Sequence, residues 1–275
     1  MSGPTMRSLA PLAYVARASR VIAAHPSEGM ERLLERVAER RDRHRPPWPY
    51  AATAACEERV HALIGAHWPC EERKNFDAVW GAVHDDLAAR GLPVGRSTFG
   101  GWDDGDSRLG RVAWCLARHL QPSRVVETGV GRGLTTHVLL EALERNGGGH
   151  LWSIDLPPLL ERRFAEETGA AVPERLRERW SLLHGSSRRR LPGLVAELGQ
   201  IDLFLHDSMH TARNLGFELG HVWPALAPHG AALIDDVEKN VTTGEFLRAH
   251  PEAPSVIFSS DDGEVLIGCV VKQSL

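Results

Sequence analysis

The spacing of hydrophobic positions changes near residue 107, and the change divides the chain into two kinds of pattern. Before that point the apolar residues recur at helical spacing, as where Leu33, Leu34 and Val37 share one face of a charged segment. Helices are predicted over residues 29–44, 51–66 and 70–90. A loop rich in glycine and aspartate is predicted over residues 91–107. The first hundred residues are therefore expected to be helical.

After residue 107, short apolar and β-branched runs alternate with helical segments. This alternation predicts a parallel sheet with helices on both faces. The five runs that predict parallel strands are residues 124–129, 150–155, 181–185, 201–207 and 230–236. The last run, 255–271, differs, because Asp262-Gly263 in its middle is a strong signal for an antiparallel hairpin. The expected fold is α/β, with a seven-stranded, mostly parallel sheet that ends in a C-terminal antiparallel hairpin, and with an N-terminal helical region.

Composition narrows the class of protein. The chain has 275 residues, 43% hydrophobic and 25% charged, which is ordinary for a globular protein, and no stretch approaches the roughly 18 apolar residues of a membrane helix. The net charge of −4 argues against strong attraction to nucleic acid. Only three of the 32 basic residues are lysines, a bias that with abundant alanine suggests a bacterial coding sequence. Since no secretory hydrophobic run is present, a cytoplasmic location is expected.

The four cysteines, Cys56, Cys70, Cys115 and Cys269, are widely separated along the chain. None forms a CxxC pair, which argues against a zinc site. Cys115 and Cys269 lie within apolar patterns and are expected in the hydrophobic core.

A glycine-rich turn, ETGVGRG at residues 127–133, follows the first predicted strand. Glycines at this point let the backbone turn tightly and approach a ligand closely. The dinucleotide-binding pattern GxGxxG would need a glycine at position 134, which is Leu134. Asp155 closes the second predicted strand, where a carboxylate can accept hydrogen bonds from both hydroxyls of a ribose.

This set of motifs resembles the class I methyltransferases that use S-adenosylmethionine, which have a Rossmann-like fold. The resemblance includes the glycine turn, Asp155, the sequence HGSS at 184–187, and the run ALAPHGAALIDD at 225–236, which is similar to a Leu-x-Pro-Gly-Gly signature. It implies S-adenosylmethionine as the cofactor, with Glu127 near its amino group and Asp155 on its ribose. The residues that it places around the cofactor are Glu127, Thr128, Gly129, Gly131, Gly133, Asp155, Gly185, Ser186, His206 and Asp207.

Polar residues gather where the fourth and fifth predicted strands end. The fourth run, IDLFLHDSMH, ends in His206, Asp207 and His210. The fifth ends in Asp235 and Asp236. Because the carboxyl ends of parallel strands meet at one edge of a sheet, the two groups are expected to be neighbours. A methyl acceptor hydroxyl needs a base or a metal to remove its proton, and clustered carboxylates suit a hard cation.

The arrangement is similar to that of the catechol-type, magnesium-dependent O-methyltransferases. The resemblance implies a metal ion, Mg²⁺ or another divalent cation, held by Asp207, Asp235 and Asp236, with Asp236 where the family has asparagine. It also implies that Asp207 and His210 are catalytic, with His210 where the family has its lysine base. An imidazole is a suitable base at neutral pH and could act without a metal. His206 has no counterpart in the pattern. The alternative is structural, with Asp207 as a helix cap and the other two aspartates as strand ends at solvent.

We expect residues 107–275 to form the methyltransferase core and residues 1–106 to form a helical region that caps the substrate side. The preferred interpretation is O-methylation of a small-molecule hydroxyl, such as that of a bacterial secondary metabolite, with His210 as general base. Two alternatives stay open. One is a methyltransferase acting on RNA or protein, which the arginine-rich residues 36–45 would serve, and the other is a binding subunit that keeps the cofactor fold without turnover. The N-terminal helices are candidate contacts for a homodimer, and no membrane partner is expected.

Overall fold

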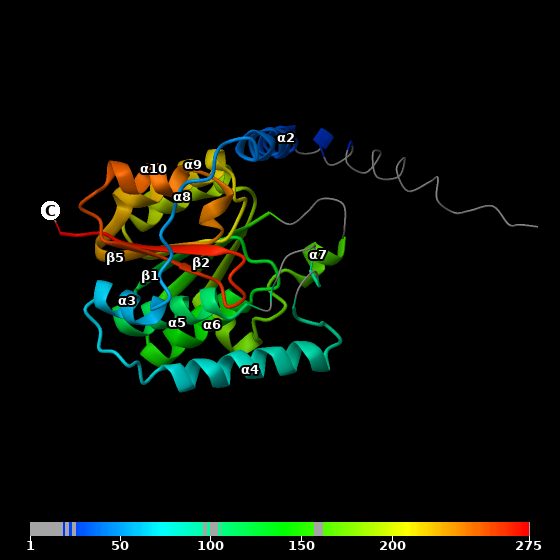
Figure 1. The fold of residues 1–275 in the computed structure, drawn as a ribbon. Helices are drawn as coiled ribbons and strands as arrows, with labels where there is room; N and C mark the ends of the chain where they lie inside the picture. The colour runs from blue at the N-terminus through cyan, green and yellow to red at the C-terminus, as the bar shows by residue number, and fades with distance from the viewer. Residues whose placement is uncertain are drawn as a thin grey trace, which may run out of the picture.

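One seven-stranded sheet forms the centre of the molecule (Figure 1). The structure, a computed structural model, describes residues 26–95, 98–99, 104, 106–156 and 162–274, together with residues 19, 22 and 23. The strands are β1 (Arg124–Thr128), β2 (His150–Asp155), β3 (Trp180–His184), β4 (Ile201–His206), β5 (Leu226–Ile234), β6 (Ser255–Ser259) and β7 (Leu266–Val271). Their order is β3-β2-β1-β4-β5-β7-β6, and only the pairs that include β7 are antiparallel. The predicted Rossmann-like α/β fold with a closing antiparallel pair is confirmed.

Helices cover both faces of the sheet (Figure 1). One layer holds α8 (Ser187–Leu198), α9 (Ala212–Ala225) and α10 (Thr242–Ala249). The opposite layer holds α3 (Cys56–Leu63), α5 (Arg108–Leu120) and α6 (Leu134–Asn146), with α4 (Arg73–Ala89) packed on its outside. The shorter helical pieces are α7 (Arg162–Glu167), η1 (Glu174–Arg179) and η2 (Val237–Lys239). Of the helices in the described ranges, none has the length and apolar character that a membrane span requires.

Helices α3 and α4 are part of the main core. Buried residues of α3 and α4, including Val60 and Phe76, lie in the same hydrophobic cluster as Val125 of β1 and Leu139 of α6. This continuity arises because α3 packs against β6 and α5, while α4 packs against α5 and α6. The division of the chain at residue 107 into two domains therefore stays a prediction.

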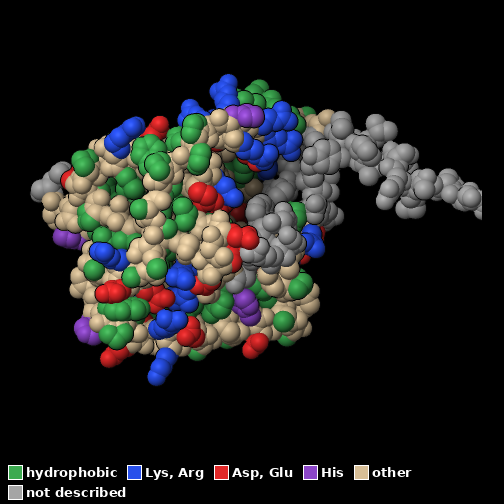
Figure 2. Space-filling view, in the orientation of Figure 1, with side chains coloured by type: hydrophobic (Ala, Val, Ile, Leu, Met, Phe, Trp, Pro, Cys, Tyr) green, Lys and Arg blue, Asp and Glu red, His purple; other side chains and the backbone are tan. Residues whose placement is uncertain are grey.

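The first described helix, α2 (Pro26–Asp42), is attached differently. Its apolar residues Met30, Leu33, Leu34 and Val37 are exposed, although helical periodicity places them on one face. Its acidic residues instead contact the loops that follow β3 and β4, as where Glu35 accepts a hydrogen bond from Thr211 and pairs with Arg213. Figure 2 shows Lys and Arg side chains gathered over the same helix. Polar contacts, rather than apolar burial, therefore hold α2 against the rest of the molecule.

Strand register brings the ends of the parallel strands to one edge of the sheet. Thr128 at the end of β1 pairs with Ile154 of β2 and with His206 of β4. Asp155 pairs with His184, and His206 pairs with Ile234 of β5. The turns that leave these strands therefore emerge side by side, at the edge where open parallel sheets bind their ligands.

Gly129, the first residue after β1, is confined by the end of β4. Its backbone has φ +85°, and a Cβ atom at this position would lie 1.9 Å from the carbonyl oxygen of Asp207. Only glycine has no such atom, so the residue lets the two turns cross in contact. The glycine is needed here for the protein's own packing, in addition to any close approach of a ligand.

We expect Gly129→Ala to destabilise the fold by at least about 3 kcal/mol, because the added methyl group forces the backbone of Asp207 to move. Gly65→Ala is the matched control, since Gly65 also has a positive φ, +68°, but nothing lies within 4 Å of an added Cβ. The control should lose only about 1 kcal/mol from backbone strain. Urea denaturation of both variants measures the difference, and equal losses would contradict the proposed collision.

Candidate active site

A buried carboxylate, Glu218 of α9, joins the ends of β1 and β4. Its Oε2 accepts hydrogen bonds from Thr128 Oγ1 and His206 Nδ1, both at 2.7 Å. Its Oε1 accepts from Asn214 Nδ2 at 2.9 Å and from Ser208 Oγ at 3.0 Å. Burial alone would raise the pKa of Glu218, but His206 and the hydroxyl donors outweigh it and the pKa is lowered. Because an ionised carboxylate only accepts, His206 carries a proton on Nδ1.

This network explains His206, which the sequence pattern left without a role. The side chain has no solvent exposure, and one of its ring nitrogens is committed to Glu218. The other nitrogen, Nε2, is buried without a hydrogen-bond partner, and the ring lies 5.4 Å from the ring of His210. His206 is thus a structural donor at the end of β4, and its predicted contact with the cofactor stays a prediction.

The glycine turn after β1 lies over a buried acid. Gly129, Gly131 and Gly133 all have positive φ angles, of 85°, 53° and 84°. Glu127, 1% exposed, accepts hydrogen bonds from Ser153 Oγ at 2.6 Å and Thr136 Oγ1 at 2.8 Å. Burial raises the pKa of Glu127 to about 8, because these two hydrogen bonds only partly offset the loss of solvent. A carboxyl group in this state is suited to a cationic ligand group, which would favour its ionised form.

Asp155 at the end of β2 supports the same turn. Its Oδ1 accepts a hydrogen bond from the backbone N–H of Val130 at 3.0 Å. Burial raises the pKa of Asp155, and the N–H groups of the turn act in the opposite direction. Its backbone carbonyl accepts from the N–H of Gly185 at 2.9 Å, which joins the turn after β3 to the end of β2. The structure therefore brings the predicted cofactor residues of three strands to one edge.

Helix α2 reaches this part of the edge from outside. Ser186, after β3, donates a hydrogen bond to Glu31 of α2, and Arg32 lies close enough to Asp155 for their charges to interact. These contacts were not predicted from the sequence, because the charged face of the helix has the appearance of a solvated surface. The N-terminal region thus contacts the turn after β3, which carries the predicted cofactor residues Gly185 and Ser186, directly.

The aspartates and the histidine after β4 and β5 come together as a cluster. Single ligand atoms of Asp207, His210 and Asp235 all lie within 4.8 Å of one another. Asp236, the third predicted metal ligand, is turned to His210, whose Nδ1 lies 2.5 Å from Asp236 Oδ2. The other ring nitrogen, Nε2, is 3.7 Å from Asp207 Oδ1 and is buried without a hydrogen-bond partner. His210 thus stands between an orienting carboxylate and an open acidic site.

The charges of this cluster depend strongly on one another. Burial and the neighbouring Asp207 raise the pKa of Asp235 well above its usual value. Burial alone would lower the pKa of His210, but Asp207 and Asp236 outweigh it and raise that pKa. Conversely, His210 lowers the pKa of Asp236 despite the burial of that carboxyl. Without a bound cation, therefore, the acids of the cluster share protons with the imidazole.

Glu218 is the central residue that the sequence analysis missed. A signal for it exists: Glu218 falls between Leu215, Leu219 and Val222, three buried positions on one face of α9. A carboxylate at a buried helical position needs partners, and His206 is the nearest titratable residue in the preceding strand. The sequence alone could have predicted the need for a partner, although not its identity.

Glu218→Ala should destabilise the protein by roughly 3–5 kcal/mol, because it leaves Thr128 and His206 buried without their acceptor. Glu252→Ala is the control: that carboxylate also pairs with a histidine, His250 at 3.1 Å, but is 54% exposed. Its removal should not measurably change the urea midpoint. Similar midpoints for the two variants would contradict the role given to Glu218.

The raised pKa of Glu127 predicts a pH dependence of stability. Between its ordinary value of 4.5 and its folded value of about 8, the folded chain keeps a proton that the unfolded chain has released. Stability should therefore fall as pH rises through this window, by roughly 3–5 kcal/mol for this group. Glu127→Gln removes the group, so its urea midpoints should fall less steeply with pH than those of the wild type. Parallel pH curves would show that Glu127 does not hold the proton.

The comparisons with known proteins agree with the fold. Residues 126–237 match the family described as "Methyltransferase domain". A search of curated proteins found no match to this chain. Many solved structures are similar, including a putative O-methyltransferase from Klebsiella pneumoniae, with 18% identity and a TM-score of 0.54 over 78% of this chain and 96% of that one. An O-methyltransferase from Bacillus cereus, in complex with SAH, has 16% identity and a TM-score of 0.54 over 79% of this chain and 97% of its own.

A third similar structure is TomG from Streptomyces achromogenes, described as an O-methyltransferase involved in tomaymycin synthesis, in complex with SAM. It has 18% identity and a TM-score of 0.52, over 70% of this chain and 89% of its own. At this identity the three structures bear on the fold, while the family match covers β1 to the turn after β5. Residues 126–237 of this chain therefore form a methyltransferase domain, and the chain has the Rossmann-like fold of the similar O-methyltransferases.

Proposed function

We propose that the protein transfers a methyl group from S-adenosylmethionine to a hydroxyl of a small molecule, with His210 as general base. The observation that carries the proposal is the environment of the two ring nitrogens of His210. Its Nδ1 is held by Asp236 at 2.5 Å, and its Nε2 is buried and without a hydrogen-bond partner beside Asp207. A carboxylate that orients one ring nitrogen, so that the other can accept a proton, is a recurrent arrangement for a catalytic histidine.

The cofactor site fits S-adenosylmethionine by its chemistry. The cofactor carries an ammonium group, a ribose and a sulfonium whose methyl group is activated for transfer. Two acids, the buried Glu127 and the half-buried Asp155, lie beside the glycine turn, and the pKa of each is raised in the absence of a cation. We assign Glu127 to the ammonium group and Asp155 to the ribose hydroxyls. Thr128, Gly185, Ser186 and His206 complete the proposed cofactor set.

The proposed role of His210 is proton transfer. A cation bound at Asp207 and Asp235 would oppose a proton on the His210 ring, so that Nε2 would take the hydroxyl proton as the acceptor oxygen gains the methyl group and later release it to water. Asp236 keeps the ring in the orientation and tautomer that leave Nε2 free. Removal of this proton in the transition state is the kind of step that contributes about 10²- to 10⁴-fold to a rate.

Asp207 and Asp235 are the proposed ligands of a divalent cation such as Mg²⁺. Their oxygens lie within 4.8 Å of each other and of a ring nitrogen of His210, a spacing that a single ion could bridge. Such an ion lowers the pKa of an acceptor hydroxyl bound to it. Asp236, which the sequence pattern also assigns to the metal, is proposed instead to act through His210.

An acceptor carried by RNA or protein is the second candidate. The observation that favours it is the group of basic side chains that Figure 2 shows over α2. The same helix contributes Glu28, Glu31 and Glu35 to contacts with the core, and the whole chain has a net charge of −4. A nucleic acid would be attracted only weakly to a helix that carries both charges on a chain of net negative charge. Small molecules therefore come first in a screen for the acceptor.

Calorimetry with S-adenosylmethionine, followed by a screen of phenol- and catechol-type acceptors with a radiolabelled methyl group, tests the proposal. His210→Gln should bind the cofactor like the wild type but lose about 10²- to 10⁴-fold in kcat. Asp236→Asn should lower kcat in the same direction, because Nε2 loses its fixed orientation. Chelation of divalent ions should lower turnover, and added Mg²⁺ should restore it.

Asp86→Asn is the control for the aspartate variants. Asp86 is an exposed residue of α4 that pairs with Arg90, so its substitution should change neither binding nor kcat. A folded protein that binds no S-adenosylmethionine would overturn the proposal as a whole. Wild-type turnover in His210→Gln would overturn the base, and turnover that survives chelation would overturn the cation.

A further inference from the structure

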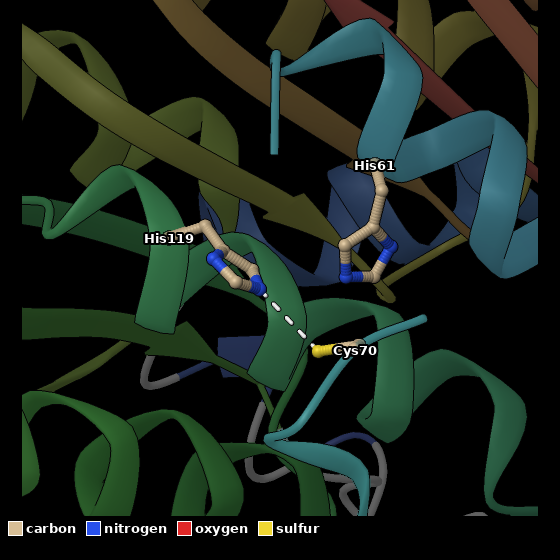
Figure 3. Close-up of side chains that lie close together, drawn as sticks. All are labelled: His61, Cys70 and His119. Atoms are coloured by element: carbon tan, nitrogen blue, oxygen red, sulfur yellow. Dashed lines mark hydrogen bonds between the residues drawn. The ribbon is translucent and has the colours of Figure 1, made fainter. Parts of the chain in front are cut away.

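A second group of metal-binding side chains lies away from the active site. His61 of α3, Cys70 in the segment before α4, and His119 in the last turn of α5 converge, with one ligand atom of each within 4.8 Å of the others. Figure 3 shows the two imidazoles approaching from separate helices, with the Cys70 sulfur between them. Cys70 Sγ lies 3.4 Å from His119 Nε2. Around a tetrahedral Zn²⁺ ion, neighbouring ligand atoms are about 3.3–3.8 Å apart, which this pair already satisfies.

The tautomer of His61 leaves a lone pair directed into the cluster. Its Nδ1 lies 2.6 Å from the backbone carbonyl oxygen of Glu57, and a carbonyl only accepts, so Nδ1 carries the hydrogen. The other nitrogen, Nε2, is therefore an acceptor in the neutral ring. It is buried in a side chain of 0% exposure and has no hydrogen-bond partner. An imidazole fixed by a backbone carbonyl, with its second nitrogen bare, is the usual state of a metal-ligating histidine.

Cys115, Trp68 and His119 surround the Cys70 side of the cluster. Hydrogen bonding with Cys115, and then with His119, lowers the pKa of Cys70. Cys115 itself is 2% exposed and lies behind Cys70 in α5. The ring of Trp68, 5.1 Å from that of His61, covers another side of the cluster. His119 is exposed, which leaves a route for an ion to enter.

We propose that His61, Cys70 and His119 bind a thiophilic divalent cation, Zn²⁺ above all, with a fourth position open to water. One thiolate and two imidazoles form a donor set that suits zinc and disfavours Mg²⁺ and Ca²⁺, which prefer oxygen. The lone pair of His61 Nε2, which has no hydrogen-bond partner, is available to bind such an ion. The site would be distinct in chemistry from the carboxylate cluster at Asp207 and Asp235.

The position of this site points to a structural role. His119 lies just before β1, at the amino edge of the parallel sheet, whereas His210 and the carboxylate cluster lie at the carboxyl edge. The ion would connect α3, the segment before α4, and α5, which also meet through apolar contacts and through the ion pairs Arg111–Glu57 and Arg118–Glu72. Binding there would stabilise the docking of the N-terminal helices without any part in methyl transfer.

Cobalt spectroscopy tests the site with the metal alone. The full-length protein, stripped of metal, should bind one equivalent of Co²⁺ with a thiolate-to-cobalt charge-transfer band and the visible bands of a tetrahedral centre. Zn²⁺ should displace it and raise the thermal midpoint. Cys70→Ser should abolish the charge-transfer band, and His119→Gln, a change at an exposed position, should weaken Co²⁺ binding at least about 10-fold.

Three controls separate this site from others. His67→Gln, an exposed residue three positions before Cys70, and Cys56→Ser, at the start of α3, should both keep the band. The double change Asp207→Asn and Asp235→Asn should also keep it, because those oxygens belong to the other cluster. The proposal is overturned if the wild type shows no charge-transfer band, or if the band survives in Cys70→Ser. Neither result depends on whether the protein methylates a hydroxyl.

Discussion

The placement of the candidate active site depends on one carboxylate that solvent does not reach. Glu218 accepts hydrogen bonds from Thr128 at the end of β1 and from His206 at the end of β4. The turns that leave these strands carry Gly129 and Asp207, which touch where they cross. A buried carboxylate without partners is strongly unfavourable. Sliding β1 along β4 would take Thr128 or His206 away from Glu218, so the observed register of the two strands is favoured. The glycine turn and the acidic cluster are thus held together by Glu218 and by the contact of Gly129 with Asp207.

The architecture was predictable because a parallel sheet has a simple signature. Its strands are buried on both faces and appear as apolar runs, as in residues 203–205, while the Asp262-Gly263 turn marks the closing antiparallel hairpin. Topology then places all strand ends at one edge, so Asp155, Asp207 and Asp235 could be expected there before any coordinates. Helix boundaries were less predictable, as the short α3 illustrates, because they depend on packing, here against β6 and α5.

Partnerships between elements could not be predicted in the same way. Asp236 has a left-handed backbone, φ +55°, and this conformation, which sequence does not specify for aspartate, turns its carboxylate to His210. Cys70 and His119 are 49 positions apart and lie in no recognisable metal motif. Spacing rules such as CxxC describe ligands within one local segment, and they do not predict ligands that come together only through helix packing.

The attachment of α2 has a consequence for the behaviour of the protein in salt. Polar and charged contacts hold this helix, and screening weakens such contacts according to their exposure, with a Debye length of about 8 Å at physiological ionic strength. The contact of Glu28 with Arg189 is partly open to solvent, whereas Glu35 and Asp42 are 7% and 9% exposed. Rising ionic strength should therefore loosen the beginning of the helix, above Ser186 and Asp155, before it loosens the end. Helix α2 should thus stay attached at its C-terminal end, near Asp42, under conditions in which its N-terminal end is released.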